Sequence, residues 1–488
     1  MKTNTLDFDA QALREKILDL AMRGKLVPQD PNDEPASVLL EKIKAEKEQL
    51  IKEKKIKKSK PLAPITDEEK PFDIPDSWEW VRLGDVSEIV MGQSPKGSTV
   101  NQNNEGIEFH QGKTEFTEKI IGKSEKYTTT LNKVIDSDYI VMAVRAPVGD
   151  VNLLDRKIAI GRGLAGIDSY LNDKEYIYYY LNGIKDYYDQ RATGSTFKAI
   201  NGAIIKDTPV PLPPLLEQSR IAAKIAQLFA LLRKVESSTQ QYAKLQTLLK
   251  SKVLDLAMRG KLVEQDPHDE PASVLLEKIK AEKEQFVKEG KIKKSKPLPP
   301  IADEEKPFDI PDSWEWVRLG NVTTVGNFHS MNPQDIQDGE NLIELADIES
   351  STGKLIKQET VNGTVGSSKY RYFKGNVLFA KLRPYLKKVL LAPNTGVCTT
   401  ELLPIDGINI DNHFLYYSFL SDFFFRQIEK EMHGVNLPRV SPKKLSEIII
   451  PIPPVLEQER ICNEISHLLF LLHKSKKINK RYFTNTKS

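Results

Sequence analysis

The sequence predicts an α+β protein: two α/β domains joined by two long antiparallel coiled-coil helical regions, in a pseudo-twofold, circularly permuted repeat. Three observations predict this class. An entrance segment, DIPDSWEWVRLG, occurs at 73–84 and again, letter for letter, at 309–320. An exit segment recurs in altered form, as PLPPLLEQSRIAAKI at 211–225 and PIPPVLEQERICNEI at 451–465. After the exit segment, apolar residues follow alternating steps of four and three, which is typical of a coiled coil.

Most of the repeated sequence lies in one block. Residues 16–86 match residues 252–322 with nine mismatches in 71 positions. The segments that follow, 87 to about 193 and 323 to about 433, show no evident similarity to each other. A duplicated frame therefore carries two different inserts.

In the entrance segment, apolar and charged residues alternate after a proline, which predicts a half-buried strand. We interpret its tryptophans as core residues in preference to residues on which bases stack.

The frame contains a long helical period. Eleven positions from 221 to 256 follow steps of four and three, and nine of them are apolar or aromatic. This narrow seam predicts a helix in coiled-coil contact, roughly 60 Å long at 1.5 Å per residue. An ordinary amphipathic helix on a globular core would show a wider and shorter stripe. The seam comprises Ile221, Ile225, Leu228, Leu232, Val235, Thr239, Tyr242, Gln246, Leu249, Val253 and Leu256.

The partner of this helix is predicted at the two ends of the chain. The two end stretches together form one second helix that pairs antiparallel with the first, so we expect the termini to meet. The seam reappears at the C-terminus as Ile461, Ile465, Leu468, Leu472, Ser475, Asn479 and Tyr482. At the N-terminus it reappears as Leu6, Ala10, Leu13, Ile17 and Leu20.

Composition excludes several other classes of protein. The 488 residues carry a net charge of +3, with no apolar run long enough to span a membrane and no signal-peptide pattern at the start. We therefore expect a cytoplasmic protein, with Cys398 and Cys462 as structural thiols. Lysine-rich segments at 51–60 and 287–296 indicate either phosphate contacts or solvated linkers.

The sequence resembles the specificity subunits of type I restriction-modification enzymes. The resemblance rests on the entrance segments, the exit segments, the LDLAMRGKLV stretches at 18–27 and 254–263, and the insert motifs given below. It covers essentially the whole chain. It implies that each insert belongs to a target recognition domain that reads one half of a split, asymmetric DNA motif, that the helices set the spacer, and that methyltransferase subunits dock on the frame. A two-armed coiled-coil adaptor that binds proteins, without DNA specificity, is the alternative.

The repeat and the resemblance together predict five segments along the chain. They are an N-terminal half-helix with a charged helix (1–60), target recognition domain 1 (73–213), a central long helix with a charged helix (214–296), target recognition domain 2 (309–453) and a C-terminal half-helix (454–488).

The first insert offers polar side chains on loops rich in Gly and Ser. Amide, hydroxyl and ammonium groups suit phosphate and base-edge contacts, and an arginine can fork onto a guanine. Each residue taken singly is equally compatible with a solvated loop, so only the clustered set favours DNA. The predicted DNA-binding residues are Gln93, Ser94, Lys96, Ser98, Gln111, Lys113, Arg145, Thr196 and Lys198.

The second insert carries a denser basic set around an aromatic residue. That mixture is typical of a surface that follows the DNA backbone, although an arginine followed by proline at 383–384 can also brace the fold. The predicted residues are Lys381, Arg383, Tyr385, Lys387, Lys388 and Arg439.

Neither insert carries a convincing catalytic motif. Gly161, Gly163 and Gly166 match a dinucleotide-binding pattern, but the residues that follow do not open a helix, so we interpret the glycines as aids to close strand packing. We predict a non-catalytic chain without a metal or cofactor of its own. The resemblance places S-adenosylmethionine, ATP and Mg in partner subunits. It implies double-stranded DNA, two methyltransferase subunits and restriction/translocase subunits as partners.

Overall fold

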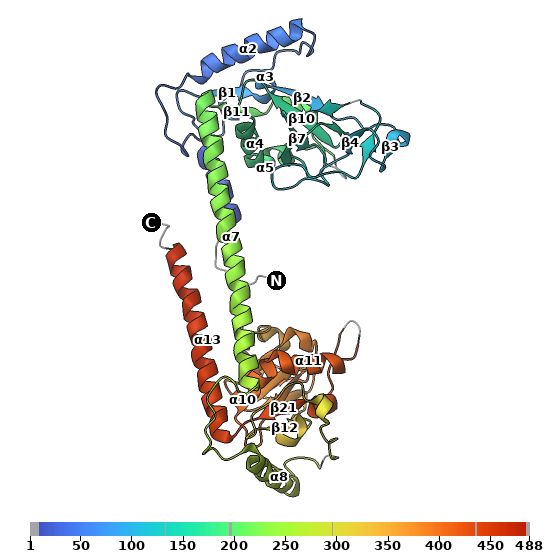
Figure 1. Cartoon of the computed structure of the whole chain (residues 1–488), viewed down its shortest axis with the longest axis vertical. Helices are drawn as coiled ribbons and strands as arrows, with labels where there is room; N and C mark the ends of the chain where they lie inside the picture. Colours follow the sequence, from blue (N-terminus) through green and yellow to red (C-terminus); the bar gives the residue numbers. More distant parts are fainter. Residues whose placement is uncertain (1–8, 132, 195–197, 295, 435–436, 485–488) are drawn as a thin grey trace. The chain divides into compact units, whose positions relative to one another are not determined.

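The computed structural model describes residues 9–131, 133–194, 198–294, 296–434 and 437–484. These residues divide into two compact units, one up to Thr239 and one from Gln240 onward. Both units combine helices with small sheets (Figure 1), so the predicted α+β class is confirmed. No helix in the described ranges is long and apolar enough to cross a membrane.

The first unit has a helical N-terminal part followed by a sheet-rich domain. Its helices are α1 (Ala10–Met22), α2 (Ala36–Lys52), α3 (Leu83–Val86), α4 (Lys174–Gly183), α5 (Lys185–Arg191), α6 (Gly202–Lys206) and the first part of α7 (Leu215–Met258). Its strands are β1 (Glu79–Arg82), β2 (Ser87–Met91), β3 (Val100–Asn101), β4 (Ile107–His110), β5 (Tyr127–Thr128), β6 (Val134–Ile135), β7 (Tyr139–Ala143), β8 (Val151–Leu153), β9 (Ile158–Ile160), β10 (Leu164–Ser169) and β11 (Pro209–Leu212).

The second unit repeats this plan. Its helices are the rest of α7, α8 (Ala272–Lys288), α9 (Leu319–Val322), α10 (Asn412–Leu420), α11 (Asp422–Glu431), α12 (Pro442–Glu447) and α13 (Val455–Thr484). Its strands are β12 (Glu315–Arg318), β13 (Ser330–Met331), β14 (Asn341–Ile343), β15 (Glu359–Thr360), β16 (Lys369–Tyr372), β17 (Val377–Ala380), β18 (Val389–Leu391), β19 (Gly396–Thr399), β20 (Leu402–Ile405) and β21 (Ile449–Ile452).

Each unit packs a small sheet against a helix of buried aromatic residues. In the first unit the sheet has the order β2-β10-β7-β8 and α4 packs on it, while a five-stranded sheet, β3-β5-β4-β9-β6, extends beyond. In the second unit α10 packs on β18-β17-β20, beside a five-stranded sheet, β13-β16-β19-β14-β15. Tyr176 and Tyr180 of α4, like Phe414 and Phe419 of α10, are buried in the main core of their unit.

The entrance and exit segments close each domain by pairing with each other. In the first unit β1 pairs antiparallel with β11. Trp78, 3% exposed, donates its indole N–H to the buried carboxylate of Glu217 (3.0 Å), which also accepts from Gln29 (2.6 Å). Burial raises the pKa of Glu217, and these two hydrogen bonds oppose that rise. The tryptophan is a core residue, as we predicted.

The second unit repeats this closure with the same residue types. β12 pairs antiparallel with β21, and Trp314 donates to Glu457 (3.0 Å), which also accepts from Gln265 (2.6 Å). The Trp of the entrance segment is thus tied to the Glu of the LEQ motif in the exit segment. That link explains why both segments occur twice, because each copy encloses one insert.

The two inserts share a backbone framework that their sequences do not reveal. After β7 in the first unit and β17 in the second, the chain makes an X-Pro turn that binds a later loop through main-chain groups. In the first unit, Ala146 N–H donates to Lys198 O (2.9 Å) and Ile200 N–H donates to Val144 O (3.0 Å). In the second unit, the equivalent bonds run from Arg383 N–H to Pro438 O (2.8 Å) and from Val440 N–H to Lys381 O (3.1 Å). The two inserts therefore make equivalent main-chain bonds at this turn with different side chains.

Helix α7 carries the predicted seam. Ile221 and Ile225 are buried, the seam positions from Leu228 to Gln246 are half-buried, and Leu249 is 49% exposed. Within the first unit, Arg14 of α1 binds Glu236 of α7 with both nitrogens of its fork. A segment from the N-terminal end of the chain thus contacts α7 at Glu236, next to the seam residue Val235.

In the second unit α7 contacts the C-terminal helix. The amide of Gln246 donates to the carbonyl of Leu472 in α13 (3.1 Å). The seam residue predicted at Leu6, and the side chains predicted at Ser475, Asn479 and Tyr482, lie outside the described part of the chain.

Candidate nucleic-acid interface

The structure brings several predicted residues of the first insert to one edge of the sheets. Three main-chain hydrogen bonds link neighbouring segments across this edge. They run from Gly163 N–H to Gln111 O (3.2 Å), from Val144 N–H to Gly163 O (2.9 Å) and from Ile200 N–H to Val144 O (3.0 Å). We call the side chains carried here the first polar edge: Gln93, Ser94, Gln111, Arg145, Arg162 and Lys198.

Two glycines make this close packing possible. A Cβ on Gly161 would lie 3.0 Å from Gln111 Cα, and one on Gly163 would lie 2.6 Å from Gln111 O. The interpretation of these glycines as packing residues is therefore confirmed. Arg162 stands between them, exposed, with its main-chain N–H on the hydroxyl of Ser94 (3.3 Å). Sequence reasoning missed Arg162; an arginine between two glycines was the available signal.

Other predicted residues of the first insert have mixed surroundings. Lys96 and Ser98 are exposed on the loop before β3. Lys198 pairs with Asp189 (3.1 Å) at the surface. Thr196 lies outside the described residues.

Lys113 is engaged inside the domain. Its ammonium group and that of Lys185 both bind the carboxylate of Asp150. Burial opposes ionisation of Asp150, but the two lysine hydrogen bonds outweigh it and lower the pKa. This pairing makes Lys113 less available to DNA than a free surface lysine.

The second insert forms a corresponding edge around the turn after β17. Lys381 N–H binds Glu401 O (3.0 Å), and Arg439 pairs with the Glu401 carboxylate (3.4 Å). Arg383 is exposed, and so is Tyr385, at 47%. We call Lys381, Arg383, Tyr385 and Arg439 the second polar edge.

The turn of the second polar edge is held in a strained form. Arg383 and Lys387 both adopt left-handed backbone angles, each with φ of 49°. Such angles persist in non-glycine residues where the surroundings enforce them, and they cluster at binding sites. Here Arg383 and Lys387 lie at the two ends of the turn that carries the exposed Tyr385.

Lys387 and Lys388 do not belong to this exposed edge. The ammonium group of Lys387 binds Asp422 and lies 4.9 Å from the ring centre of Phe425. That of Lys388 binds the carbonyl of Leu345, and burial lowers its pKa. The basic set predicted as one cluster is therefore divided between a surface edge and two internally bound lysines.

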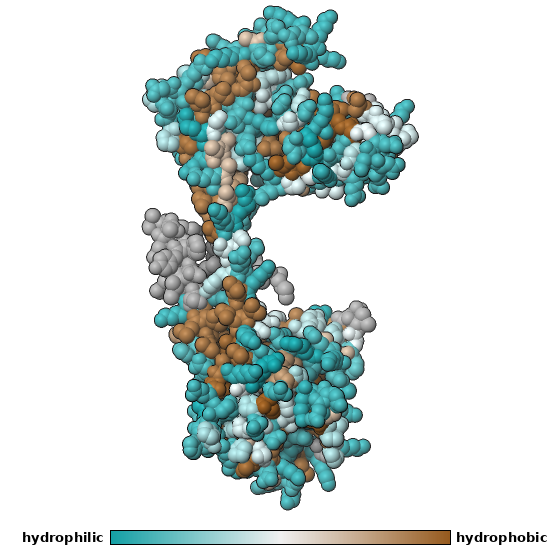
Figure 2. Space-filling model, in the orientation of Figure 1, coloured by the Kyte–Doolittle hydropathy of each residue, from teal (hydrophilic) through white to brown (hydrophobic). Residues whose placement is uncertain are grey.

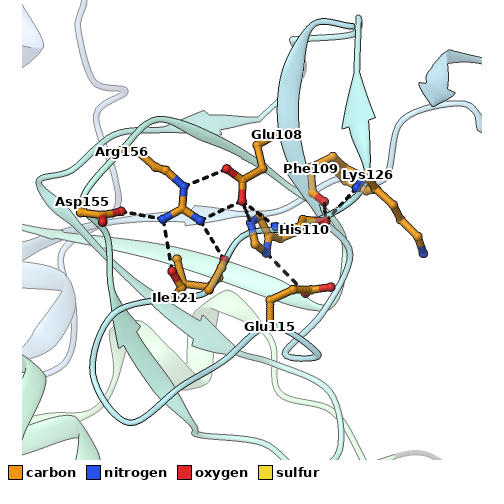
Figure 3. Close-up of polar contacts among 10 residues, drawn as sticks. Glu108, Phe109, His110, Glu115, Ile121, Lys126, Asp155 and Arg156 are labelled. Carbon is orange, nitrogen blue, oxygen red and sulfur yellow. Dashed lines mark hydrogen bonds and ion pairs between the residues drawn. The ribbon is translucent and has the colours of Figure 1, made fainter. Parts of the chain in front are cut away.

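A buried charged network lies directly behind the first polar edge (Figure 3). Arg156 binds both carboxylate oxygens of Glu108, each at 2.8 Å, and also donates to the carbonyl of Gly122 (2.8 Å). The fully buried ring of His110 faces Glu108 (2.8 Å) and Glu115 (3.4 Å). Because Gln111 follows His110 directly, this network fixes the strand end that carries it.

The charges of this network are stable ones. Burial opposes ionisation of Glu108, but hydrogen bonds from Arg156 and the Ser124 N–H outweigh it and hold its pKa at about 2. No group of three or more His, Cys, Asp or Glu side chains in the described ranges is placed to hold a metal ion. Glu108 is therefore held as a carboxylate that accepts from Arg156 and the Ser124 N–H.

A pH effect on stability is expected from Asp168 in the same domain. It lies across from Glu88 and Tyr139 in the sheet, and burial, with Asp138 and Glu88, raises its pKa to about 6. Since the folded-state pKa is raised, the stabilisation is present below about pH 4 and is lost as pH rises through about 6. We expect the free energy of unfolding of Asp168→Asn to change less between pH 4 and pH 7 than that of the wild type. Denaturant titrations at both pH values test this. A variant whose free energy of unfolding changes with pH as much as that of the wild type would contradict it.

Comparison with known proteins gives one consistent family. The family model described as "Type I restriction modification DNA specificity domain" matches twice, at residues 75–246 and 311–480. The EcoAI specificity subunit of Escherichia coli is 33% identical, over 97% of this chain and 91% of that protein. The EcoEI specificity subunit of Escherichia coli is 34% identical, over 77% of this chain and 73% of that protein. The crystal structure of the HsdS subunit from Thermoanaerobacter tengcongensis is 29% identical, covering 52% of this chain and 57% of that one, with a TM-score of 0.33.

The two family-model matches and the two Escherichia coli relatives define a DNA-specificity protein with two recognition domains. The chain belongs to the family of type I restriction-modification specificity subunits. The resemblance given by the repeated segments is thereby confirmed, and with it the expectation of a non-catalytic chain whose function is DNA sequence recognition. The protein-binding adaptor is not favoured.

Proposed function

We propose that the first and second polar edges are the surfaces that read the two halves of a split, asymmetric DNA motif. The single observation that carries this proposal is the shared turn after β7 and β17, which has the same main-chain bonds in both domains and different side chains. Shared main-chain bonds that carry different side chains suit two readers of different sequences. We keep the recognition domains at 73–213 and 309–453, where the paired entrance and exit strands support those limits.

The long helices set the distance between the half-sites. This proposal requires that the two end helices together form one partner helix, split between the chain ends, in antiparallel coiled-coil contact with α7. With that pairing, the chain is a pseudo-twofold, circularly permuted repeat. The contacts Arg14–Glu236 and Gln246–Leu472 support it, because each joins α7 to one of the two end helices within its unit. Each heptad adds roughly 10 Å of helix, or about three base pairs of spacer.

Two methyltransferase subunits dock on the frame. Each exit segment begins its helix with an exposed apolar pair, Leu215 and Leu216 in one unit and Val455 and Leu456 in the other, with exposures between 40% and 65%. Apolar side chains also gather on the exposed faces of the helices of the second unit (Figure 2), among them Phe470. Repeated exposed apolar surface of this kind is typical of a contact site used twice.

The chemistry of the complex resides in the partners. S-adenosylmethionine is held by the methyltransferase subunits, and ATP and Mg by the restriction/translocase subunits. This chain supplies the DNA sequence specificity, and the complex works in the cytoplasm, where the chromosome lies.

The salt dependence of DNA binding tests the proposal. The chain with its methyltransferase subunits is expected to bind duplex DNA with a logarithm of affinity that falls linearly with the logarithm of salt concentration, because lysines and arginines release phosphate counterions. Gel-shift titrations from about 50 to 200 mM salt are expected to show a loss of at least 100-fold for several phosphate contacts. A slope near zero would favour the protein-binding adaptor instead.

A further inference from the structure

Two arginines of the first unit differ from the others that the structure describes there. Arg145 and Arg162 are exposed, and within the described ranges neither guanidinium group has a hydrogen bond, an ion pair or an aromatic ring as partner. Every other described arginine of this unit binds a carboxylate or a ring: Arg14, Arg23, Arg82, Arg156, Arg191, Arg220 and Arg233. The unit therefore uses its arginines structurally except at these two positions.

The two unpartnered arginines flank one main-chain hydrogen bond. β7 and β10 pair antiparallel with Ala143 across from Leu164, and the next bond runs from Val144 N–H to Gly163 O (2.9 Å). Arg145 follows Val144, and Arg162 precedes Gly163 in the turn before β10. Both arginines are exposed there, so the first polar edge carries two positive charges beside this bond.

Two positive charges at one edge, without a carboxylate between them, repel each other in the free protein. The other arginines of the unit show that a carboxylate partner is readily provided, yet none is provided here. An electron-rich ligand between the two forks removes the repulsion.

The surroundings of Arg162 favour the edge of a base over an isolated phosphate. Gly161 and Gly163 flank it, and Gly112 next to Gln111 has open space in front of its Cα. At Gly112 a base pair can therefore approach the backbone closely. Beside it stand an amide and a hydroxyl, since Gln111 and Ser94 are bonded to each other (2.9 Å), and these are groups that read base edges.

We propose that Arg162, with Arg145 on the other side of the Val144–Gly163 bond, reads a guanine of the first half-site through the O6 and N7 acceptors of its major-groove edge. The inference rests on the proposed function of the first polar edge and names its specificity-determining residue. A forked arginine on guanine is the commonest specific contact in the major groove. Arg162 is thus the residue whose loss relaxes one position of the motif.

The second domain provides the natural comparison. β17 pairs with β20 so that Ala380 lies across from Leu402, and the bond from Lys381 N–H to Glu401 O matches the one at Val144 and Gly163. The residues that flank this bond are Leu382, after Lys381, and Thr400, before Glu401. The position of the two arginines is thus occupied by an apolar residue and a hydroxyl in the second domain, as expected if the two half-sites differ.

The test uses the full chain in complex with its methyltransferase subunits. Arg162→Thr introduces the residue that the second domain has at this place, and Arg162→Lys keeps the charge without the fork. Binding is measured to duplexes that carry the wild-type motif or one changed base pair in the first half-site. Methylation sequencing of cells expressing each variant gives the modified motif. Arg191→Thr is the control, because it removes an exposed arginine of the same unit that is held against Tyr187.

The wild type is expected to prefer guanine at one position of the first half-site by roughly 10- to 100-fold. Arg162→Thr and Arg162→Lys are expected to lose that preference while the second half-site is still read, which also shows that both variants are folded. Arg191→Thr keeps the full motif. Unchanged discrimination at every position overturns the inference. So does a uniform loss of affinity with a salt slope reduced by about one, the result for a phosphate contact. A wild-type complex with no split motif would instead refute the proposed function itself.

Discussion

Replacing Arg156 by Met is expected to destabilise the first unit by about 3 kcal/mol, the lower end of the effect of breaking a buried ion pair. The change leaves the carboxylate of Glu108, only 11% exposed, without the fork that binds both its oxygens. It also removes the donor to the carbonyl of Gly122. The positive charge of Arg156 is then missing beside the carboxylates that face the buried His110. We therefore expect strand β4 and the loop after it to open together.

Hydrogen exchange followed by mass spectrometry measures this effect where it arises. Peptides covering β4 and β9 are expected to exchange faster in Arg156→Met, while those of the second unit stay unchanged. Adding Glu108→Gln removes the unpaired charge and is expected to restore part of the protection. Arg233→Met is the matched control, because its pair with Glu118 is exposed and worth less than about 1 kcal/mol. Equal exchange in Arg156→Met and Arg233→Met would contradict a stabilising role for the network.

Arg156→Met also carries a functional expectation. Gln111 directly follows His110, and its carbonyl accepts the Gly163 N–H at the first polar edge. Loosening β4 therefore displaces the edge without touching any residue proposed to contact DNA. Recognition of the first half-site is expected to weaken while the second is retained.

The frame could be predicted from the sequence because its signals are local and occur twice. The alternating tryptophan strand, the exit motif and the seam each follow a period that a single helix or strand imposes. Trp78 and Glu217 lie 139 positions apart, yet both stand in repeated segments, so their link is encoded by two motifs that always occur together. The family followed from the same repeats.

The internal arrangement of the inserts could not be predicted in the same way. Their shared turn is made by main-chain N–H and carbonyl groups, which place few demands on side chains, so two dissimilar sequences form it. The internal binding of Lys387 depends on Asp422, and that of Lys113 on Asp150, partners that only the folded chain brings close. Arg162 was missed because the glycines on either side of it were interpreted as packing residues, and the arginine between them was not weighed as a DNA contact.

Exchanging one insert for the other is expected to produce the largest change in function. Replacing Ser87–Asp207 by Thr323–Glu447 puts the second recognition surface on both frames. The borders are equivalent: Leu83 N–H binds Thr208 O just outside the first insert, and Leu319 N–H binds Ile448 O outside the second, each at 2.8 Å. The incoming segment also brings its own contact to the frame, since Asp411 N–H binds Gln458 (3.0 Å) where Asp173 N–H binds Gln218 (2.9 Å).

The modified motif of this exchanged chain is expected to be the second half-site twice, in inverted orientation, because a pseudo-twofold frame now presents identical readers. The first half-site should disappear completely, and the spacer should stay the same, since no helix of the frame has changed length. The reciprocal exchange, with Thr323–Glu447 replaced by Ser87–Asp207, is the control and should give the first half-site twice. Methylation sequencing of cells that express each chain with the methyltransferase subunits reads both outcomes. A motif that keeps its first half after the exchange would place the reading residues outside the inserts, and a motif with two direct repeats would refute the twofold relation of the two frames.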